Sequence, residues 1–333
     1  MSATSLSRAQ FLRGALGLTT AAVGAGLLAP VLAHAEVAAA PAAQATGPQP
    51  MLICDLSLNG AYQGRVSSAR GGNAYAELTP RSPRTLGPTS YRPIDIAINM
   101  SMGPGIYEAI NNAWSNRGKS VSGSVFRAAG TGGLILERRF EGADVIATTF
   151  PTFDLRQSDE IVWLTVRLAP RKTQDQAIKS LPFAADSIRL RVLRSRDFAL
   201  DIGDVNTKGV VRVDSFTFQS GKATGDEVGK LRADTSLPLT PILKVSVYRQ
   251  YSSDWVDWLN TTIAERRSDA MKSGALRFLS FDGTTELGRL NLINAGICEL
   301  TEPAAGSSET EDVLVATVFC ERMELVLAKP EKH

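Results

Sequence analysis

Carboxylates are the main side chains in this sequence that could do acid–base chemistry, because histidine is almost absent. The chain has only two histidines: His34 lies in a predicted signal peptide, and His333 is the last residue. After cleavage, this inventory leaves no Ser-His-Asp triad and no His-ligated metal site. Asp254 and Asp257 fall on the polar side of a predicted helix, and residues 309–312 (ETED) precede a predicted strand. A carboxylate-pair hydrolase is an alternative, but pairs of this kind are typical of a solvated surface.

The remaining reactive or ligand-binding motifs are sparse. Cys54, Cys298 and Cys320 are widely spaced and form no CxxC pair, so we predict no metal site, with one disulfide or buried thiols both open. No phosphate-binding G-x-x-x-x-G-K-[ST] motif occurs, and the glycines of 130–133 (GTGG) fit a hairpin turn. The sequence therefore predicts no enzyme, no catalytic residue, no cofactor and no bound metal.

The composition is that of a folded chain without a strong electrostatic bias. The 333 residues are 44% hydrophobic and 21% charged, with a formal net charge of +2. This balance does not favour nucleic acid or another polyanion as a partner.

The first 35 residues have the pattern of a secretory signal peptide. Arg8 and Arg13 precede an apolar run, and residues 33–35 (AHA) form a small-residue cleavage site. Residues 7–13 are similar to a twin-arginine signal but have Ala9 where the second arginine belongs, so both export routes stay open. We expect residues 36–50, rich in Ala and Pro, to be a flexible lead-in. We predict an exported chain (periplasmic, secreted or at the cell surface) with no later segment apolar enough to span a membrane.

Two stretches predict short amphipathic helices rich in aromatic residues. In residues 252–267 (SSDWVDWLNTTIAERR) and 103–118 (GPGIYEAINNAWSNRG), the apolar side chains recur at helical spacing along one face. The predicted core residues are Ile106, Tyr107, Ile110 and Trp114 in the earlier helix and Trp255, Trp258, Leu259 and Ile263 in the later one.

The elements around these helices follow the same order twice. Each copy reads as a hairpin, a long loop, an alternating strand, the helix, a second hairpin and a closing strand. The closing strands align residues 158–170 (SDEIVWLTVRLAP) with 310–322 (TEDVLVATVFCER). The alternating strands before the helices contain the predicted inner-strand and assembly residues: Ile94, Ile96, Ile98, Leu243, Val245 and Val247.

The repeat predicts an α+β, mainly β protein made by tandem duplication. Each copy is expected to be an antiparallel sheet or partly closed barrel covered by one helix. The predicted boundaries are domain 1 over 51–170, a charged connector over 171–197, domain 2 over 198–328 and a tail over 329–333.

Each copy resembles the tail-tube family of contractile phages and related injection systems. The matching stretches are SSDWVDWLN, GALRFLSFDGTTELGRLNLINAGICE and TEDVLVATVFCERMELVLA in copy two, and GIYEAINNAW, GSVFRAAGTGGLILERRFEGADV and SDEIVWLTVRLAP in copy one. The resemblance implies a structural protein whose partner is itself, with six such domains closing a ring around a channel. Three two-domain chains would suffice, and rings could stack into a tube. This chain departs from the family in its tandem copies and its signal peptide.

A second hypothesis is a monomeric secreted binding module that uses the cleft between the two copies. Predicted long loops at matched sites, 75–93 and 220–238, favour assembly, because a ring can use both loops to contact neighbours.

Overall fold

The computed structural model describes residues 52–78, 85–115, 117–129, 135–157, 159–182, 192–220, 241–265, 270–303 and 312–328. The predicted signal peptide (1–35), lead-in (36–50) and C-terminal tail (329–333) lie outside the described residues. The GTGG turn and nearly all of the second predicted long loop also lie outside them. Neither described helix is long and apolar enough to cross a bilayer.

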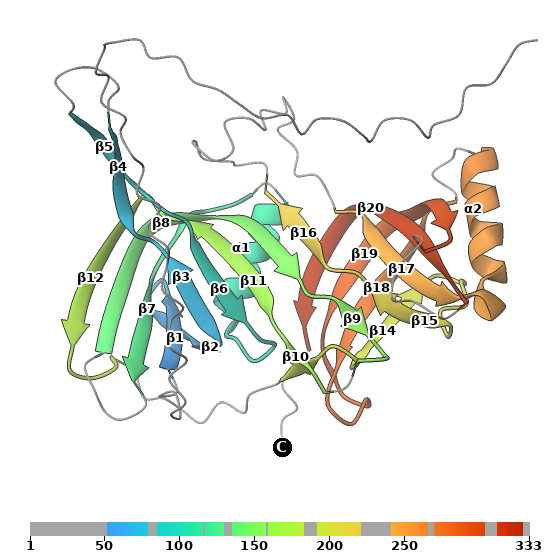
Figure 1. Ribbon diagram of the computed structural model, residues 1–333, viewed down its shortest axis with the longest axis horizontal. Helices are drawn as coiled ribbons and strands as arrows, with labels where there is room; N and C mark the ends of the chain where they lie inside the picture. The colour runs from blue at the N-terminus through green and yellow to red at the C-terminus, as the bar shows by residue number, and fades with distance from the viewer. Residues whose placement is uncertain are drawn as a thin grey trace, which may run out of the picture. The chain divides into compact units, whose positions relative to one another are not determined.

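The first half of the described chain builds a curled antiparallel sheet (Figure 1). Its neighbouring strands follow the order β2-β1-β7-β8-β11-β6-β3. Their bounds are β1 Leu52–Leu58, β2 Ala61–Val66, β3 Ser68–Gly71, β6 Ile94–Ile98, β7 Val121–Ala129, β8 Ile135–Phe150 and β11 Leu164–Ala169. The β1–β2 turn lies at Asn59-Gly60 as predicted, and both residues have positive φ (48° and 80°), as a tight hairpin turn requires.

The second half builds another antiparallel sheet, with the order β14-β18-β19-β20-β17-β15-β9. Its strands are β9 Phe153–Asp154, β14 Phe198–Ile202, β15 Val210–Val213, β17 Leu243–Tyr248, β18 Lys272–Leu279, β19 Glu286–Thr301 and β20 Val313–Leu327.

The two sheets have the same strand order. Reading across each sheet, β1, β7, β8, β11, β6 and β3 correspond to β14, β18, β19, β20, β17 and β15. Each half also has one main helix between the equivalent strands β6 and β7 or β17 and β18. The mainly β, α+β class predicted from the sequence is therefore confirmed, and the matching order supports the predicted duplication.

The helices α1 (Pro104–Trp114) and α2 (Ser253–Glu265) bury the apolar face that the spacing predicts, with one exception. Ile106, Tyr107, Ile110 and Trp114 are buried in α1, and Trp255 and Trp258 are buried in α2, while Leu259 is partly buried against the core.

The prediction that Ile263 is a core residue is wrong, because its side chain is 58% exposed. Ile263 lies in the last turn of α2, about 80° around the helix from Trp255 at 100° per residue. It therefore falls at the margin of the buried stripe, where no described element covers it.

Short strands are exchanged between the halves. From the first half, β9 pairs with β15 in the second sheet. From the second half, β16 (Phe216–Gln219) pairs with residues 147–150 of β8 in the first sheet. This exchange places β16 against α1, as Figure 1 shows near the middle of the view.

An aromatic cluster fills the region where the strands are exchanged. Phe150 of β8 stacks on Phe216 (centroids 4.7 Å apart) and on Phe278 of β18 (6.2 Å). Phe153 also stacks on Phe278, at 5.4 Å. The two halves consequently share one hydrophobic core.

Two segments predicted to be loop or connector contain strands. Strand β12 (Lys172–Ile178) pairs with β8 and extends the first sheet into the predicted connector. Strands β4 (Ala74–Leu78) and β5 (Leu86–Tyr91) form a hairpin within the predicted long loop 75–93. None of the residues of β4, β5 and β12 is buried, so these strands lack the apolar alternation that marks a half-buried strand. A last short pair joins β10 (Ile161–Val162) to β13 (Leu193–Arg194).

Candidate functional site

The predicted inner strands β6 and β17 alternate between an apolar and a polar face. Ile94, Ile96, Ile98, Leu243, Val245 and Val247 are all at most 1% exposed, so they pack into the core. Their side chains therefore cannot contact a neighbouring molecule. Because side chains alternate along a strand, Asp95 and Ala97 of β6 and Lys244 of β17 face the other way and are at least partly exposed.

In the first half, this outward face forms a shallow polar hollow. Its charged residues are Arg70, Asp95 and Arg167, and Arg167 donates from Nε to Asp95 Oδ1 at 2.8 Å. Thr149 and Thr217 are in hydrogen-bond contact across the β8–β16 pair, with their Oγ1 atoms 2.9 Å apart. This lining is hydrophilic, and its two arginines and one aspartate leave one positive charge in excess.

A second hollow of about 790 Å³ lies on the equivalent face of the second half. Arg212 donates from Nε to Asp214 Oδ1 at 2.7 Å, and Thr317 donates from Oγ1 to Glu299 at 3.2 Å. Lys244 also lines this hollow. Its charged residues include both signs in equal number.

Strand β16 joins the two hollows, since Thr217 and Gln219 line both. We call the combined surface the polar wall; it follows β3, β6, β11, β8, β16, β15, β17, β20 and the end of β19. Its lining includes several threonines and the ion pairs Arg167–Asp95 and Arg212–Asp214. Such a wall can be hydrated and can contact a passing or bound molecule weakly, but it concentrates no charge of one sign.

Nothing on the polar wall has the arrangement of a catalytic centre. No three His, Cys, Asp or Glu side chains lie close enough to hold a metal ion in the part of the chain that the structure describes. The carboxylates singled out in the sequence stay apart: Asp254 accepts from the Asn206 backbone N–H at 3.0 Å, and Asp312 pairs with Arg249. Asp257 is exposed on α2. Glu309 and Glu311 lie outside the described residues.

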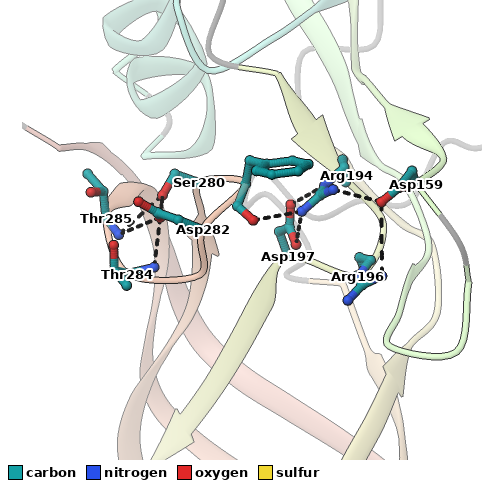
Figure 2. A network of polar contacts seen from close by, with 9 residues as sticks. Asp159, Arg194, Arg196, Asp197, Ser280, Asp282, Thr284 and Thr285 are labelled. Carbon is teal, nitrogen blue, oxygen red and sulfur yellow. Dashed lines mark hydrogen bonds and ion pairs between the residues drawn. The ribbon is translucent and has the colours of Figure 1, made fainter.

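A polar network around Arg194 ties the end of the first half to a turn of the second (Figure 2). The guanidinium of Arg194 binds both oxygens of Asp197 and donates to Asp159 at 2.7 Å. It also donates to the Phe281 carbonyl at 2.9 Å and lies over the Phe281 ring, 3.9 Å from its centroid. Arg194 thus positions the β18–β19 turn, and its role is structural.

Within that turn, Asp282 organises the backbone. It accepts hydrogen bonds from Ser280 Oγ and from the Thr284 N–H. These bonds, led by that of Ser280, hold the pKa of Asp282 well below its usual range. The same bonds explain why the Asp-Gly signal of the sequence marks a hairpin turn here.

A second charged cluster joins β12 and the β3–β4 connection to β8. Arg138, which is buried, donates from Nε and Nη2 to the two oxygens of Asp175, both at 2.6 Å. It also binds the Gly71 carbonyl and Asn73 Oδ1. The hydrogen bond from Arg138 holds the pKa of Asp175 below its ordinary value. Burial would raise the pKa of neighbouring Glu137, but hydrogen bonds led by that from Arg139 bring it below its ordinary value.

The three cysteines are free thiols in different surroundings. Cys54 and Cys320 are buried, and burial raises the pKa of both, that of Cys320 to about 12. Cys298 is exposed near the end of β19, and partial burial and the charge of Glu299 raise its pKa. No disulfide forms among them.

The residues that join the two halves were not predicted from the sequence. Phe216 and Phe218 lie on β16, and Asn111 of α1 binds the backbone of β20. The alternation FTFQ at 216–219 was the available signal for β16, but nothing local indicates that it joins the sheet of the other half.

The chain matches no protein-family model and no curated protein.

Proposed function

We propose that this protein is a structural component that assembles with copies of itself into a ring, in the manner of the tail-tube family that its repeats resemble. Three chains would supply six domains, and rings could stack into a tube. The polar wall would face the channel, with Asp95, Ala97 and Lys244 rather than the buried residues of β6 and β17 lining it.

One observation carries the proposal: within a single chain, the second half adds strand β16 to an edge of the first sheet. The two halves have the same strand order, so a contact of this kind can be repeated between chains. A repeated contact of one surface with a different surface is heterologous, and it must close into a ring or continue as a filament.

The proposal also includes export before assembly. It rests on the signal-peptide pattern of residues 1–35, and it locates the ring outside the cytoplasm. The proposal includes no cofactor. It includes no nucleic acid either, since the polar wall carries four basic and three acidic side chains and so concentrates no strong charge of one sign.

The alternative is a monomeric exported binding module. The hollow of about 790 Å³, to which residues on both sides of the strand exchange contribute, favours it. Its ligand would be a polar molecule that hydrogen-bonds to threonines and paired charges.

Light scattering of the exported chain after size exclusion, followed by negative-stain imaging, separates the two. We expect a species of about three chain masses and ring-shaped particles. A monomer from micromolar to near-millimolar concentration, with no rings on the grid, would overturn the ring and favour the binding module.

A further inference from the structure

The two helices expose different faces, although they occupy equivalent places in the two halves. Counted from its first residue, each helix buries its third and sixth positions: Ile106 and Ala109 in α1, Trp255 and Trp258 in α2. This alignment pairs Asn111 with Asn260 at the eighth position and Trp114 with Ile263 at the eleventh.

In α1 these two positions contact the second half of the chain. Trp114 stacks on Phe218 of β16, with centroids 4.7 Å apart, and is 5% exposed. Asn111 donates from Nδ2 to the Leu325 carbonyl at 2.8 Å and accepts from the Leu325 N–H at 2.9 Å. The amide of Asn111 thus pairs with the outer edge of β20 as another strand would.

In α2 the same positions are uncovered. Ile263 is 58% exposed, Val256 at the fourth position is 37% exposed, and Asn260 is exposed. In α1, by contrast, the fourth-position residue Tyr107 is buried. Among the described residues, this face of α2 is therefore the more exposed of the two.

The sheet edge beside each helix shows the same difference. Residues 147–150 of β8 have β11 on one side and β16 on the other. The corresponding end of β19, residues 298–301, pairs with β20 on one side, and no described strand pairs with its other side. Three of its four residues, Cys298, Glu299 and Thr301, are exposed, whereas Thr148 and Phe150 of β8 are fully buried.

Strand β4 is the counterpart of β16 in the first half, but it does not join either main sheet of the described chain. Strand β16 follows β15 after two residues, and β4 follows the equivalent strand β3 after two residues. Whereas β16 lies on β8, β4 pairs only with β5 among the described strands. Their hairpin exposes Leu78 (62%) and Leu86 (71%).

We propose that the exposed face of α2 and the 298–301 edge of β19 form a docking surface for the first half of a second copy of this chain. The β4–β5 hairpin of that copy would add to the edge of β19. Asn260 would bind the outer edge of β12 in that second copy. In the first sheet β12 pairs with residues 135–141 of β8, and in the second sheet residues 320–327 of β20 pair with the equivalent part of β19. The partner is a second copy of this chain because the equivalent contact, that of α1 with β16 and β20, already forms between the two halves of one chain. The inference rests on the proposed ring and specifies which surfaces meet in it.

The decisive variant is Ile263→Arg, tested in the exported chain by light scattering. The side chain is exposed in the single chain, so the substitution leaves the fold unchanged by circular dichroism. It should raise the concentration for half-assembly by about tenfold or more, since a loss of about 1.4 kcal/mol of binding energy gives a factor of ten. The matched control is Thr261→Arg, which places the same charge on the opposite, exposed side of α2 and should assemble normally.

Cross-linking tests the contact directly. Ala76→Cys and Glu77→Cys, each on β4, should cross-link to Cys298 of another chain, because the other two cysteines are buried. Thr284→Cys, in the β18–β19 turn, should give no cross-link to Cys298. In the unaltered chain, iodoacetamide should label Cys298 in the monomer and much more slowly in the assembled form.

The outcomes separate this inference from the proposed function. Rings that persist in Ile263→Arg and give no β4–Cys298 cross-link would overturn the docking surface and leave the ring in place. A chain that never assembles would overturn both. Assembly that is lost in Ile263→Arg, retained in Thr261→Arg and cross-linked through β4 would establish the contact.

Discussion

Replacing Trp114 by alanine tests whether the two halves are held together by the strand exchange. Trp114 is 5% exposed and lies between Phe150 of its own half and Phe218 of the other, with centroids at 6.1 and 4.7 Å. Removing a large aromatic side chain from a packed core costs about 3–5 kcal/mol. Of this, the stacked pair with Phe218 accounts for about 0.5–1.5 kcal/mol.

Ile263→Ala is the matched control, since Ile263 occupies the same position in α2 and is 58% exposed. In the monomer it should change the free energy of unfolding by no more than about 0.5 kcal/mol. The two equivalent substitutions should therefore differ by about 3 kcal/mol or more.

The assay is urea unfolding followed by circular dichroism, which does not depend on the removed indole. Protein concentration is kept where light scattering shows a monomer, so that assembly does not add to the measured stability. A double-mutant cycle with Phe218→Ala isolates the stacked pair. Equal midpoints for Trp114→Ala and Ile263→Ala, or no coupling between Trp114 and Phe218, would refute the shared core.

Three further predictions concern the core, the response to acid and export. Trp258→Ala should lower the free energy of unfolding by about 3–5 kcal/mol, because its side chain is 3% exposed and its Nε1 donates to a backbone carbonyl; an unchanged thermal midpoint would contradict this. The pKa of Asp175 is lowered in the folded state by Arg138, so its contribution is present above the unfolded pKa and is lost as pH falls through the folded value. The thermal midpoint should therefore fall below about pH 4, and Asp175→Asn should make that fall shallower; parallel pH profiles would exclude the pair as a cause. N-terminal sequencing of the exported chain should begin at or near Glu36, and recovery of the intact N-terminus would contradict cleavage.

The parts of the fold that were predictable are those with a local apolar pattern. The alternation of Ile94, Ile96 and Ile98 marks β6, because one face of that strand is fully buried. The Asn59-Gly60 pair marks the β1–β2 turn, because it requires two positive φ angles. The repeated order of such elements indicated two sheets with one helix each.

The parts that were missed depend on contacts between distant segments. Strand β12 carries no buried residue, so its membership of the sheet depends on backbone pairing and on the Arg138–Asp175 contact. The burial of Trp114 and the exposure of Ile263 could not be told apart from their spacing, because each lies eight residues after a buried residue, Ile106 or Trp255, and so at the same angle around its helix. What separates them is Phe218, which comes from the other half.

The exchange of β16 also sets the order in which the chain can complete its fold. Synthesis runs from the N-terminus, so residues 147–150 of β8 have no partner on one side until residues 216–219 have been made. The hydrogen bond of Asn111 can form only later still, since its backbone partner Leu325 lies 214 positions further along the chain. Pairings between such distant segments slow folding, because closing the long loop between them costs entropy before the contact is formed. A chain that ends before residue 216 therefore presents an open strand edge at residues 147–150 and is prone to aggregate. That edge can close only after β16 has been made.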